Sequence, residues 1–264
     1  MKIITTPWKN ELLELVSNCT KSIKITSPFV KENICNEVLS KKKIQTNFEL
    51  ITSFKLPNFH SGSLDLSALD KIIEANGTVK NFSKLHSKIY LFDDKKVIIT
   101  SGNLTNGGLI NNYEYGIYSD DKLFVSKVVL DFEAISNNEN TGVVKKTDIN
   151  TVREILSKLP KAIPQKLPKY AIETPEERFD VLEIPDNSIT STLNGWKLEV
   201  FKCVNSIPNQ FFSLKEVNEF ENNLRKIYPS NNRIKDKIRQ QLQYLRDLGL
   251  IEFLGNGQYK KLWK

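Results

Sequence analysis

A proline-rich stretch divides this sequence into two parts with different patterns. Five of the ten prolines lie between Pro160 and Pro185. Because proline fixes φ and lacks a backbone N–H, the stretch favours a stiff, extended linker. The sequence therefore predicts two domains, which suits a chain of 264 residues. We place them at residues 1–136 and 193–264, joined by a linker of residues 137–192 that contains one short helix near 149–159.

Before residue 136, strand-like and helix-like patterns alternate along the chain. Alternating or wholly apolar runs predict strands at residues 22–26, 48–53, 85–92, 96–101 and 113–118. Apolar residues spaced three and four apart predict helices at residues 11–16, 31–39, 64–75 and 120–135. This order predicts an α/β fold, in which a mixed sheet is sandwiched between helices.

The positive charge of the chain is concentrated near its end. The net charge is +7, and residues 191–264 hold 13 Lys or Arg against 7 Asp or Glu, a net of +6. A basic excess confined to one module is typical of nucleic-acid binding, although a solvated basic surface gives the same numbers. The three cysteines show no metal-ligand spacing and indicate reduced thiols in the cytoplasm. No apolar run is long enough to span a membrane, so we expect a cytoplasmic protein without a membrane partner.

Five polar residues of the first part are candidates for a catalytic site. His86 and Lys88 are two residues apart, which places both side chains on one face of a strand. Ser101 and Asn103 repeat this spacing at the end of a later predicted strand, and Glu114 begins or lies on the one after that. All five side chains can therefore converge at one edge of a sheet.

These residue types suit the cleavage of a phosphodiester bond. A neutral imidazole can attack phosphorus and form a covalent phosphohistidine. Lys88 can bind a phosphate oxygen, and Ser101 and Asn103 can donate hydrogen bonds to oxygens that gain charge in the transition state. The carboxylate of Glu114 can fix the tautomer of the imidazole. Since lysine supplies the positive charge and no carboxylate cluster is visible nearby, we expect neither a metal nor another cofactor.

Each of these residues also has a plainer interpretation. A single histidine such as His86 is more often a core or surface residue than a catalyst. Glu114 can be a solvated strand residue, and the Asn-Gly-Gly that follows Asn103 is typical of a turn. Asp93 and Asp94 indicate a hairpin turn. The joint spacing of the set favours the catalytic interpretation over these separate ones.

The spacing resembles the phospholipase D superfamily signature, His-x-Lys-(x)4-Asp-(x)6-Gly-Ser-x-Asn. The matching residues are His86, Lys88, Asp93, Ser101 and Asn103, while Thr100 stands where the family has glycine. Glu114 follows Asn103 by 11 residues, as in the single-motif nucleases of that superfamily. The resemblance implies a phospholipase D-like fold with His86 as the nucleophile, Lys88 and Asn103 as phosphate ligands, and Asp93 as a structural residue.

The number of motif copies bears on the assembly of the chain. Members of the superfamily build one site from two copies of the motif, in which one histidine attacks and the other protonates the leaving group. This sequence contains one copy. The resemblance therefore implies a homodimer formed through the N-terminal domain, with one shared site between the subunits.

The last part of the chain has the pattern of a winged helix-turn-helix. Helices are predicted at residues 196–206, at 214–227, and from a cap at Asn231 or Asn232 to residue 247. Ser213 and Glu216 have the spacing of a capping box at the start of the second helix. Two strands, 250–254 and 258–262, flank Gly-Asn-Gly, which predicts a β-hairpin.

The third of these helices supplies candidate contacts to DNA. Ile234, Ile238, Leu242 and Leu245 form its buried stripe, and the opposite side carries polar and basic residues that include Arg246. Arg and Gln pair with guanine and adenine edges, and lysines on the wing suit phosphates. The candidate DNA-binding residues are Asn232, Arg233, Lys235, Asp236, Arg239, Gln240, Gln243, Lys260 and Lys261. An ordinary basic helix face remains the plainer interpretation.

The stretch of residues 212–259 resembles the winged helix of Dam-replacing proteins and DpnI-type restriction endonucleases. That resemblance implies a module that reads a short site in double-stranded DNA. The two parts together predict a type II restriction endonuclease that cuts DNA without metal, with methylated and unmethylated DNA both open as substrates. The alternatives are a DNA-binding transcription regulator whose phospholipase D-like domain only dimerises, and a lipid phosphodiesterase of the phospholipase type.

Overall fold

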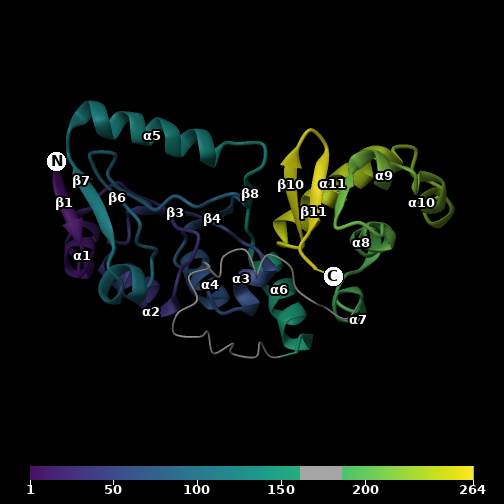
Figure 1. Cartoon of the computed structure of the whole chain (residues 1–264), viewed down its shortest axis with the longest axis horizontal. Coiled ribbons are helices and arrows are strands. Elements are labelled where there is room, and N and C mark those ends of the chain that lie inside the picture. Colours follow the sequence, from purple (N-terminus) through teal and green to yellow (C-terminus); the bar gives the residue numbers. More distant parts are fainter. Residues whose placement is uncertain (161–185, 264) are drawn as a thin grey trace. The chain divides into compact units, whose positions relative to one another are not determined.

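The structure, a computed structural model, describes residues 1–160 and 186–263 (Figure 1). The described residues form two compact units. The first consists of Met1–Phe54 and Gly62–Ile149, and the second of Lys55–Ser61 and the described part of Asn150–Lys264. The proline-rich part of the predicted linker, residues 161–185, lies outside the described residues. The domain limits at residues 136 and 192 stay predictions.

One mixed sheet forms the centre of the first unit. Its strands are β1 (Lys2–Thr5), β2 (Ser22–Thr26), β3 (Asn47–Thr52), β4 (Thr78–Asn81), β5 (Ile89–Phe92), β6 (Lys96–Thr100), β7 (Tyr115–Ser119) and β8 (Gly142–Val143). They lie in the order β1-β7-β6-β5-β2-β3-β4-β8. The β2–β3 and β3–β4 pairs are parallel, and the remaining pairs are antiparallel. The predicted mixed α/β sheet is confirmed.

Helices cover both faces of this sheet. They are α1 (Lys9–Asn18), α2 (Glu32–Lys41), α4 (Leu66–Glu74) and α5 (Lys122–Ser136), with a π-helix η1 at Gly107–Asn111. Figure 1 shows α5 along one side of the sheet and α1, α2 and α4 along the other. On the α5 side, Val125, Val128 and Phe132 pack in one apolar cluster with Leu91 and Val97 of the sheet. The central strand β5 is buried throughout because both faces are covered.

The second unit contains a bundle of helices and a small sheet. Its helices are α3 (Leu56–His60), α7 (Asp186–Thr190), α8 (Gly195–Ser206), α9 (Leu214–Asn218), α10 (Glu221–Ile227) and α11 (Ile234–Asp247). Helix α6 (Lys146–Lys158), which begins in the first unit and continues in the second, is the helix predicted near residues 149–159. The sheet has the order β10-β11-β9, with strands β9 (Phe211–Ser213), β10 (Ile251–Gly255) and β11 (Gln258–Lys261). Helix α11 and the β10–β11 hairpin are the third helix and the wing of the predicted winged helix-turn-helix.

The capping of the second unit's helices agrees with the sequence only in part. The predicted capping box is confirmed, because Ser213 Oγ accepts from Glu216 N at 3.2 Å and Glu216 Oε2 accepts from Ser213 N at 2.7 Å. The single helix expected at 214–227 is wrong: the N–H groups of residues 219 and 220 bond three residues back, which separates α9 from α10. The asparagine cap of α11 is also wrong, since Arg233 holds the cap position. The N–H of Arg233 donates to Asn231 Oδ1 at 2.8 Å in the turn before the helix.

Within residues 1–160 and 186–263, no helix combines the length and the apolar character that crossing a membrane requires.

Candidate active site and nucleic-acid interface

His86 and Lys88 lie in an extended segment just before strand β5. The strand predicted to begin at residue 85 begins at Ile89, so both residues precede strand β5. Lys88 Nζ nevertheless lies 3.3 Å from His86 Nδ1 and donates to the His86 carbonyl oxygen at 2.7 Å. His86 is exposed, whereas Lys88 is only 8% exposed. The ammonium group is therefore held in a fixed position beside an accessible imidazole.

The residue between them anchors this segment to the neighbouring strand. Thr26, at the end of β2, donates to the Ser87 carbonyl oxygen at 3.2 Å and lies 3.0 Å from Ser87 Oγ. The N–H of Ile89 donates to Thr26 Oγ1 at 3.0 Å. Ser87 is thus turned toward β2, and the extended backbone directs His86 away from it.

A serine and a glutamate meet where strand β6 ends and strand β7 begins. Ser101 Oγ donates to Glu114 Oε2, and the N–H of Tyr115 donates to Ser101 Oγ at 3.2 Å. Asn112 Nδ2 donates to the other carboxylate oxygen of Glu114 at 3.2 Å. Both oxygens of Glu114 are therefore oriented by neighbouring side chains. The predicted role of this carboxylate in holding the imidazole stays a prediction.

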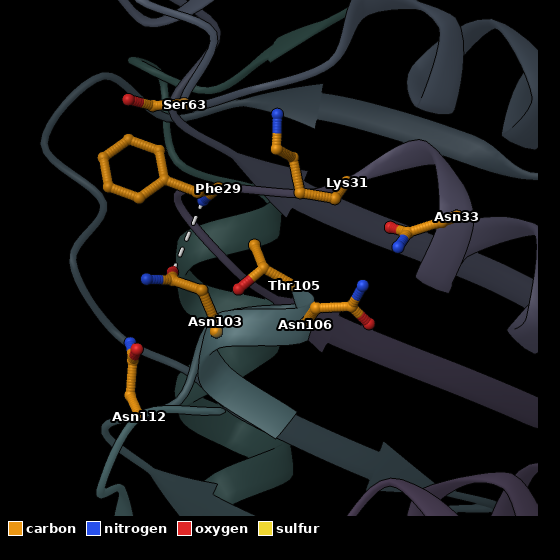
Figure 2. Close-up of a pocket in the computed structure, with 9 residues that line it drawn as sticks. Phe29, Lys31, Asn33, Ser63, Asn103, Thr105, Asn106 and Asn112 are labelled. Atoms are coloured by element: carbon orange, nitrogen blue, oxygen red, sulfur yellow. Dashed lines mark hydrogen bonds between the residues drawn. The ribbon is translucent and has the colours of Figure 1, made fainter. Parts of the chain in front are cut away.

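The carboxamide of Asn103 has a defined orientation. Its Oδ1 accepts from the N–H of Phe29 and from Ser27 Oγ, each at 3.4 Å. Since a backbone N–H can only donate, the oxygen must face Phe29 and the nitrogen must face away. Figure 2 shows this arrangement, with the nitrogen of Asn103 directed away from Phe29. Asn103 therefore presents a hydrogen-bond donor, as binding a phosphate oxygen requires.

Backbone hydrogen bonds bring these segments to one end of the sheet. The N–H of Thr100 donates to the Lys88 carbonyl oxygen at 3.1 Å, and that of Ser101 donates to the Tyr115 carbonyl oxygen at 3.0 Å. In the antiparallel β5–β6 and β6–β7 pairs, the beginnings of β5 and β7 therefore lie beside the end of β6. The five predicted residues, His86, Lys88, Ser101, Asn103 and Glu114, all lie at this end.

Two glycines fix the backbone around Asn103. A Cβ on Gly102 would lie 2.3 Å from the Gly108 carbonyl oxygen, and one on Gly108 would lie 2.3 Å from the Asn103 carbonyl oxygen. The beginning of η1 thus packs directly on the Asn103 turn. Two buried side chains hold the backbone of these glycines. Tyr90 Oη donates to the Gly102 carbonyl oxygen, and Trp8 Nε1 donates to the Gly108 carbonyl oxygen, each at 2.9 Å. The interpretation of this segment as a turn and its interpretation as part of a site are therefore compatible.

Asp93, the remaining signature residue, is structural. Asp93 and Asp94 have φ of 54° and 55° and form the turn of the β5–β6 hairpin, as predicted. The carboxylate of Asp93 accepts from the N–H groups of residues 20–22 at 2.7–3.0 Å. Although burial raises the pKa of this carboxyl, these backbone donors outweigh it and hold the pKa below its usual value.

Replacing Asp93 by asparagine tests this anchor. Asparagine tolerates the left-handed backbone but places an NH2 group against N–H donors. We expect Asp93→Asn to lower the free energy of unfolding by about 1–2 kcal/mol at neutral pH, measured by urea unfolding. Because the pKa is depressed in the folded state, the difference from wild type is full above the unfolded pKa and shrinks as pH falls through the folded pKa. Asp94→Asn is the control, and an equal loss from both changes would contradict this role.

On helix α11, the predicted DNA-binding residues lie on the exposed face. The exposed residues are Asn232, Arg233, Lys235, Asp236, Arg239, Gln240 and Gln243. The predicted buried stripe is confirmed, with Ile234, Ile238, Leu242 and Leu245 among the buried residues of α11. A hollow of about 370 Å³ lies at the beginning of the helix, where Asn231 and Lys237 join three of the predicted residues. Lys237 was not among the predicted residues, but it follows Arg233 by one helical turn, and this spacing could have identified it from the sequence.

Two basic residues differ from the expectation for this surface. Arg246 is only 9% exposed and pairs with Asp247 at 2.8 Å, because it follows Leu242 by four residues and borders the buried stripe. Lys261 is 6% exposed, and its Nζ donates to the Ile207 carbonyl oxygen. The alternation along β11 places Lys261 on the inner face, while Lys260 is partly exposed. Lys261 is therefore a packing residue of the wing, contrary to its predicted role as a phosphate ligand.

Some neighbours of the candidate site were not identified from the sequence. Asn112 is two residues before Glu114, and its spacing offers a weak signal for the contact between them. Phe29 has no such signal, because its contact with Asn103 depends on the β2 and β6 segments meeting in space. In the described ranges, no group of three or more His, Cys, Asp or Glu side chains has a geometry that could hold a metal ion.

Two families match different parts of the chain. Residues 12–136 match the family described as cardiolipin synthase, PLD-like domain, and residues 192–261 match the family described as Dam-replacing HTH domain. The DISARM protein DrmC of Bacillus paralicheniformis is 37% identical over 60 residues, which are 22% of this chain and 25% of that protein. The chain thus matches only a quarter of the length of this curated relative.

Solved structures with similar chain traces were also found. NucT from Helicobacter pylori is 21% identical, with a TM-score of 0.43, and the match covers 51% of this chain and 93% of that one. Nuc from Salmonella typhimurium, a phospholipase D family member, is 14% identical, with a TM-score of 0.47, and the match covers 55% and 97% of the two chains.

The family matches confirm both resemblances on which the sequence analysis depended. The first family match begins within α1 and ends at the last residue of α5, and so spans the central strands of the sheet. The second match runs from before α8 to the end of β11. Residues 12–136 therefore form a phospholipase D-like domain, and residues 192–261 form a C-terminal winged helix-turn-helix domain of the Dam-replacing type.

Proposed function

We propose that this protein is a sequence-specific endodeoxyribonuclease that cuts double-stranded DNA without a metal ion. The observation that carries the proposal is the meeting of His86, Lys88, Ser101, Asn103 and Glu114 at one end of the sheet, with the Lys88 ammonium beside the imidazole. Phosphodiester cleavage needs a nucleophile, donors for the phosphoryl oxygens and a proton for the leaving oxygen. The C-terminal domain supports DNA as the substrate.

The proposed reaction has two steps. A nitrogen of the His86 imidazole attacks phosphorus, the bond from phosphorus to the leaving oxygen breaks, and a second histidine gives that oxygen a proton. Lys88 and the Asn103 carboxamide stabilise the phosphoryl oxygens. Water then gives a proton to that second histidine and attacks the phosphohistidine, the P–N bond breaks, and the imidazole is released. Because one chain carries one such histidine, the second would be the partner subunit's His86.

An uncovered apolar surface beside the site supports the proposed homodimer. Ile3 of β1 and Ile117 of β7 are register partners, so their side chains share one face of the sheet. Ile3, Ile117, Tyr115 and Tyr113 are 64%, 41%, 52% and 85% exposed, respectively. We call these four residues the β1–β7 patch. Tyr113 and Tyr115 flank Glu114 in the chain, so a second copy docked on the patch would lie next to a residue of the proposed site. Contiguous apolar surface of this kind marks interfaces.

The α11 surface gives a direct test of sequence reading. We expect Arg239→Ala to reduce cleavage at the recognition site by roughly 10-fold to 100-fold, because an arginine that pairs with a guanine edge contributes about 1–3 kcal/mol of discrimination. Cleavage rates on a cognate duplex and on single-base variants measure the change. Arg225→Ala is the matched control, since Arg225 pairs with Glu221 on α10 at 2.7 Å. An equal loss for both variants would mean that α11 contributes only non-specific charge.

Plasmid cleavage in the presence of EDTA tests the proposed activity and its substrate. Plasmid isolated with and without adenine methylation should be cut in EDTA to discrete fragments in at least one case, and the methylation state that is cut identifies the substrate. Failure to cut either plasmid while binding DNA would favour a transcription regulator. Hydrolysis of phospholipid vesicles in preference to DNA would favour the lipid phosphodiesterase.

A further inference from the structure

A cavity of about 400 Å³ opens beside Asn103. It belongs to the first unit and lies between the segment that follows β2 and the turn that leads from β6 into η1 (Figure 2). Its wall combines the Phe29 ring with carboxamide side chains from Asn33, Asn103, Asn106 and Asn112. The volume lies in the range of small-molecule sites, roughly 300–1,000 Å³. Asn103, to which the proposed function assigns phosphate binding, therefore also lines this cavity.

The described residues that line the cavity provide no unpaired positive charge for binding an anion. Among the described residues that line it, Lys31 alone is charged. Its ammonium donates to Asp65 Oδ1 at 2.7 Å and to the Gly62 carbonyl oxygen at 2.6 Å. A phosphate subsite would present an unpaired cation, whereas here the cation is neutralised by Asp65. The chemistry of the wall fits a neutral, planar and polar ligand.

The carboxamides provide donors and acceptors for such a ligand. Asn103 uses its oxygen on Phe29 and Ser27, which leaves its NH2 group directed outward. The side chain of Asn106 makes no hydrogen bond within the described part of the chain, so both its donor and its acceptor are available. A single carboxamide pairs with the N6 and N7 edge of adenine through two hydrogen bonds. The half-buried Phe29 ring supplies a stacking surface for a base.

We propose that this cavity is a nucleobase subsite, which receives one base of the strand being cut. The inference rests on the proposed nuclease function, because Asn103 lines the cavity and also contacts the scissile phosphate in that function. A base adjacent to that phosphate leaves the stack, packs on Phe29 and pairs with Asn106. Enzymes that act within a duplex use such pockets for extruded bases. The subsite would add a preference, with adenine favoured, to the sequence reading of the winged helix.

A binding experiment tests the subsite without requiring cleavage. Saturation-transfer NMR on the full chain would observe the protons of adenosine 5′-monophosphate, alone and in competition with deoxyribose 5-phosphate or inorganic phosphate. We expect saturation of the adenine protons, lost in Phe29→Leu and retained in Asn111→Ala, which alters an exposed residue of the same π-helix. Phe29→Leu keeps the backbone N–H that orients Asn103. Displacement of adenosine 5′-monophosphate by an equal concentration of either probe without a base, or adenine saturation that is unchanged in Phe29→Leu, would overturn the subsite.

A cleavage experiment distinguishes a base of the strand from a free nucleotide. Duplexes with one abasic position at a time around the cut would be tested with wild type and Phe29→Leu. We expect one abasic position next to the cut to slow wild type about tenfold, and Phe29→Leu to be equally slow with or without that base. If adenosine 5′-monophosphate binds but no abasic position matters, the cavity serves a free nucleotide and the strand subsite is wrong.

The two proposals fail in different ways. If the wild-type protein shows no DNA cleavage that depends on His86, the nuclease proposal is wrong. The NMR comparison would still decide whether the cavity holds a base. Normal cleavage without base-dependent binding would remove the subsite and leave the nuclease.

Discussion

Replacing His86 by alanine should abolish DNA cleavage, with a fall in rate on the order of 10⁴-fold or more. The imidazole is the group that bonds to phosphorus in the proposed reaction, so its removal leaves Lys88 and Asn103 to bind a phosphate that nothing attacks. Cleavage would be measured on plasmid and duplex in EDTA, and DNA binding by fluorescence anisotropy. Binding should stay within about threefold of wild type, because the α11 surface is unaltered.

The chain supplies its own control for this change. It contains two histidines, and the other, His60, lies on helix α3 with Nε2 2.7 Å from the Pro160 carbonyl oxygen. His60→Ala should leave the cleavage rate nearly unchanged. Acid trapping of wild type with labelled DNA should yield a protein–DNA adduct that His86→Ala does not form. Undiminished cleavage by His86→Ala would reject the phosphohistidine route altogether.

A charge introduced into the β1–β7 patch should give an inactive monomer. In Ile117→Asp the carboxylate would be buried without a partner at the proposed interface, and such losses weaken association by roughly 100-fold or more. Light scattering during gel filtration should show a dimer for wild type and a monomer for the variant. Specific activity should fall at low protein concentration and recover in part as the concentration rises, because a half-site regains its partner by mass action.

Two further variants distinguish loss of the dimer from a folding defect. Ile3→Asp places the same charge on a more exposed position of the patch and should have the same effect. Ile44→Asp makes the same substitution at a side chain that is 99% exposed and outside the patch, and should remain dimeric and active. An active monomer in either patch variant would mean that one chain holds a complete site.

Local patterns explain why most of the fold was predictable from the sequence. Strand β2 matched its predicted range because SIKIT alternates cleanly, and α4 was evident because its apolar residues recur every three or four positions. Strands β1 and β8 are two or four residues long and sit at the edges of the sheet, so they carry little pattern. Strand β9 was missed for the same reason, since it adds three residues to the wing.

The candidate site was predictable to the extent that its residues are close in sequence. The pair His86 and Lys88 follows from spacing, and strand order places Ser101 and Glu114 at the same end of the sheet. The hydrogen bond between Ser101 and Glu114 was not predicted. The orientation of Asn103 depends on Phe29, more than 70 residues away, and no local pattern encodes such a contact. The burial of Lys261 depends on which face of a short strand turns inward, which side-chain type alone does not decide.

The packing of Gly102 against Gly108 limits how this site could be transplanted. Signature residues placed on another sheet would bring the imidazole, the ammonium and the carboxamide, but not the close backbone approach that sets Asn103 in place. A designer who copies the catalytic side chains must therefore also copy the backbone conformation at Gly102 and Gly108. In this protein, the position of Asn103 depends on the absence of a Cβ atom at Gly102 and at Gly108.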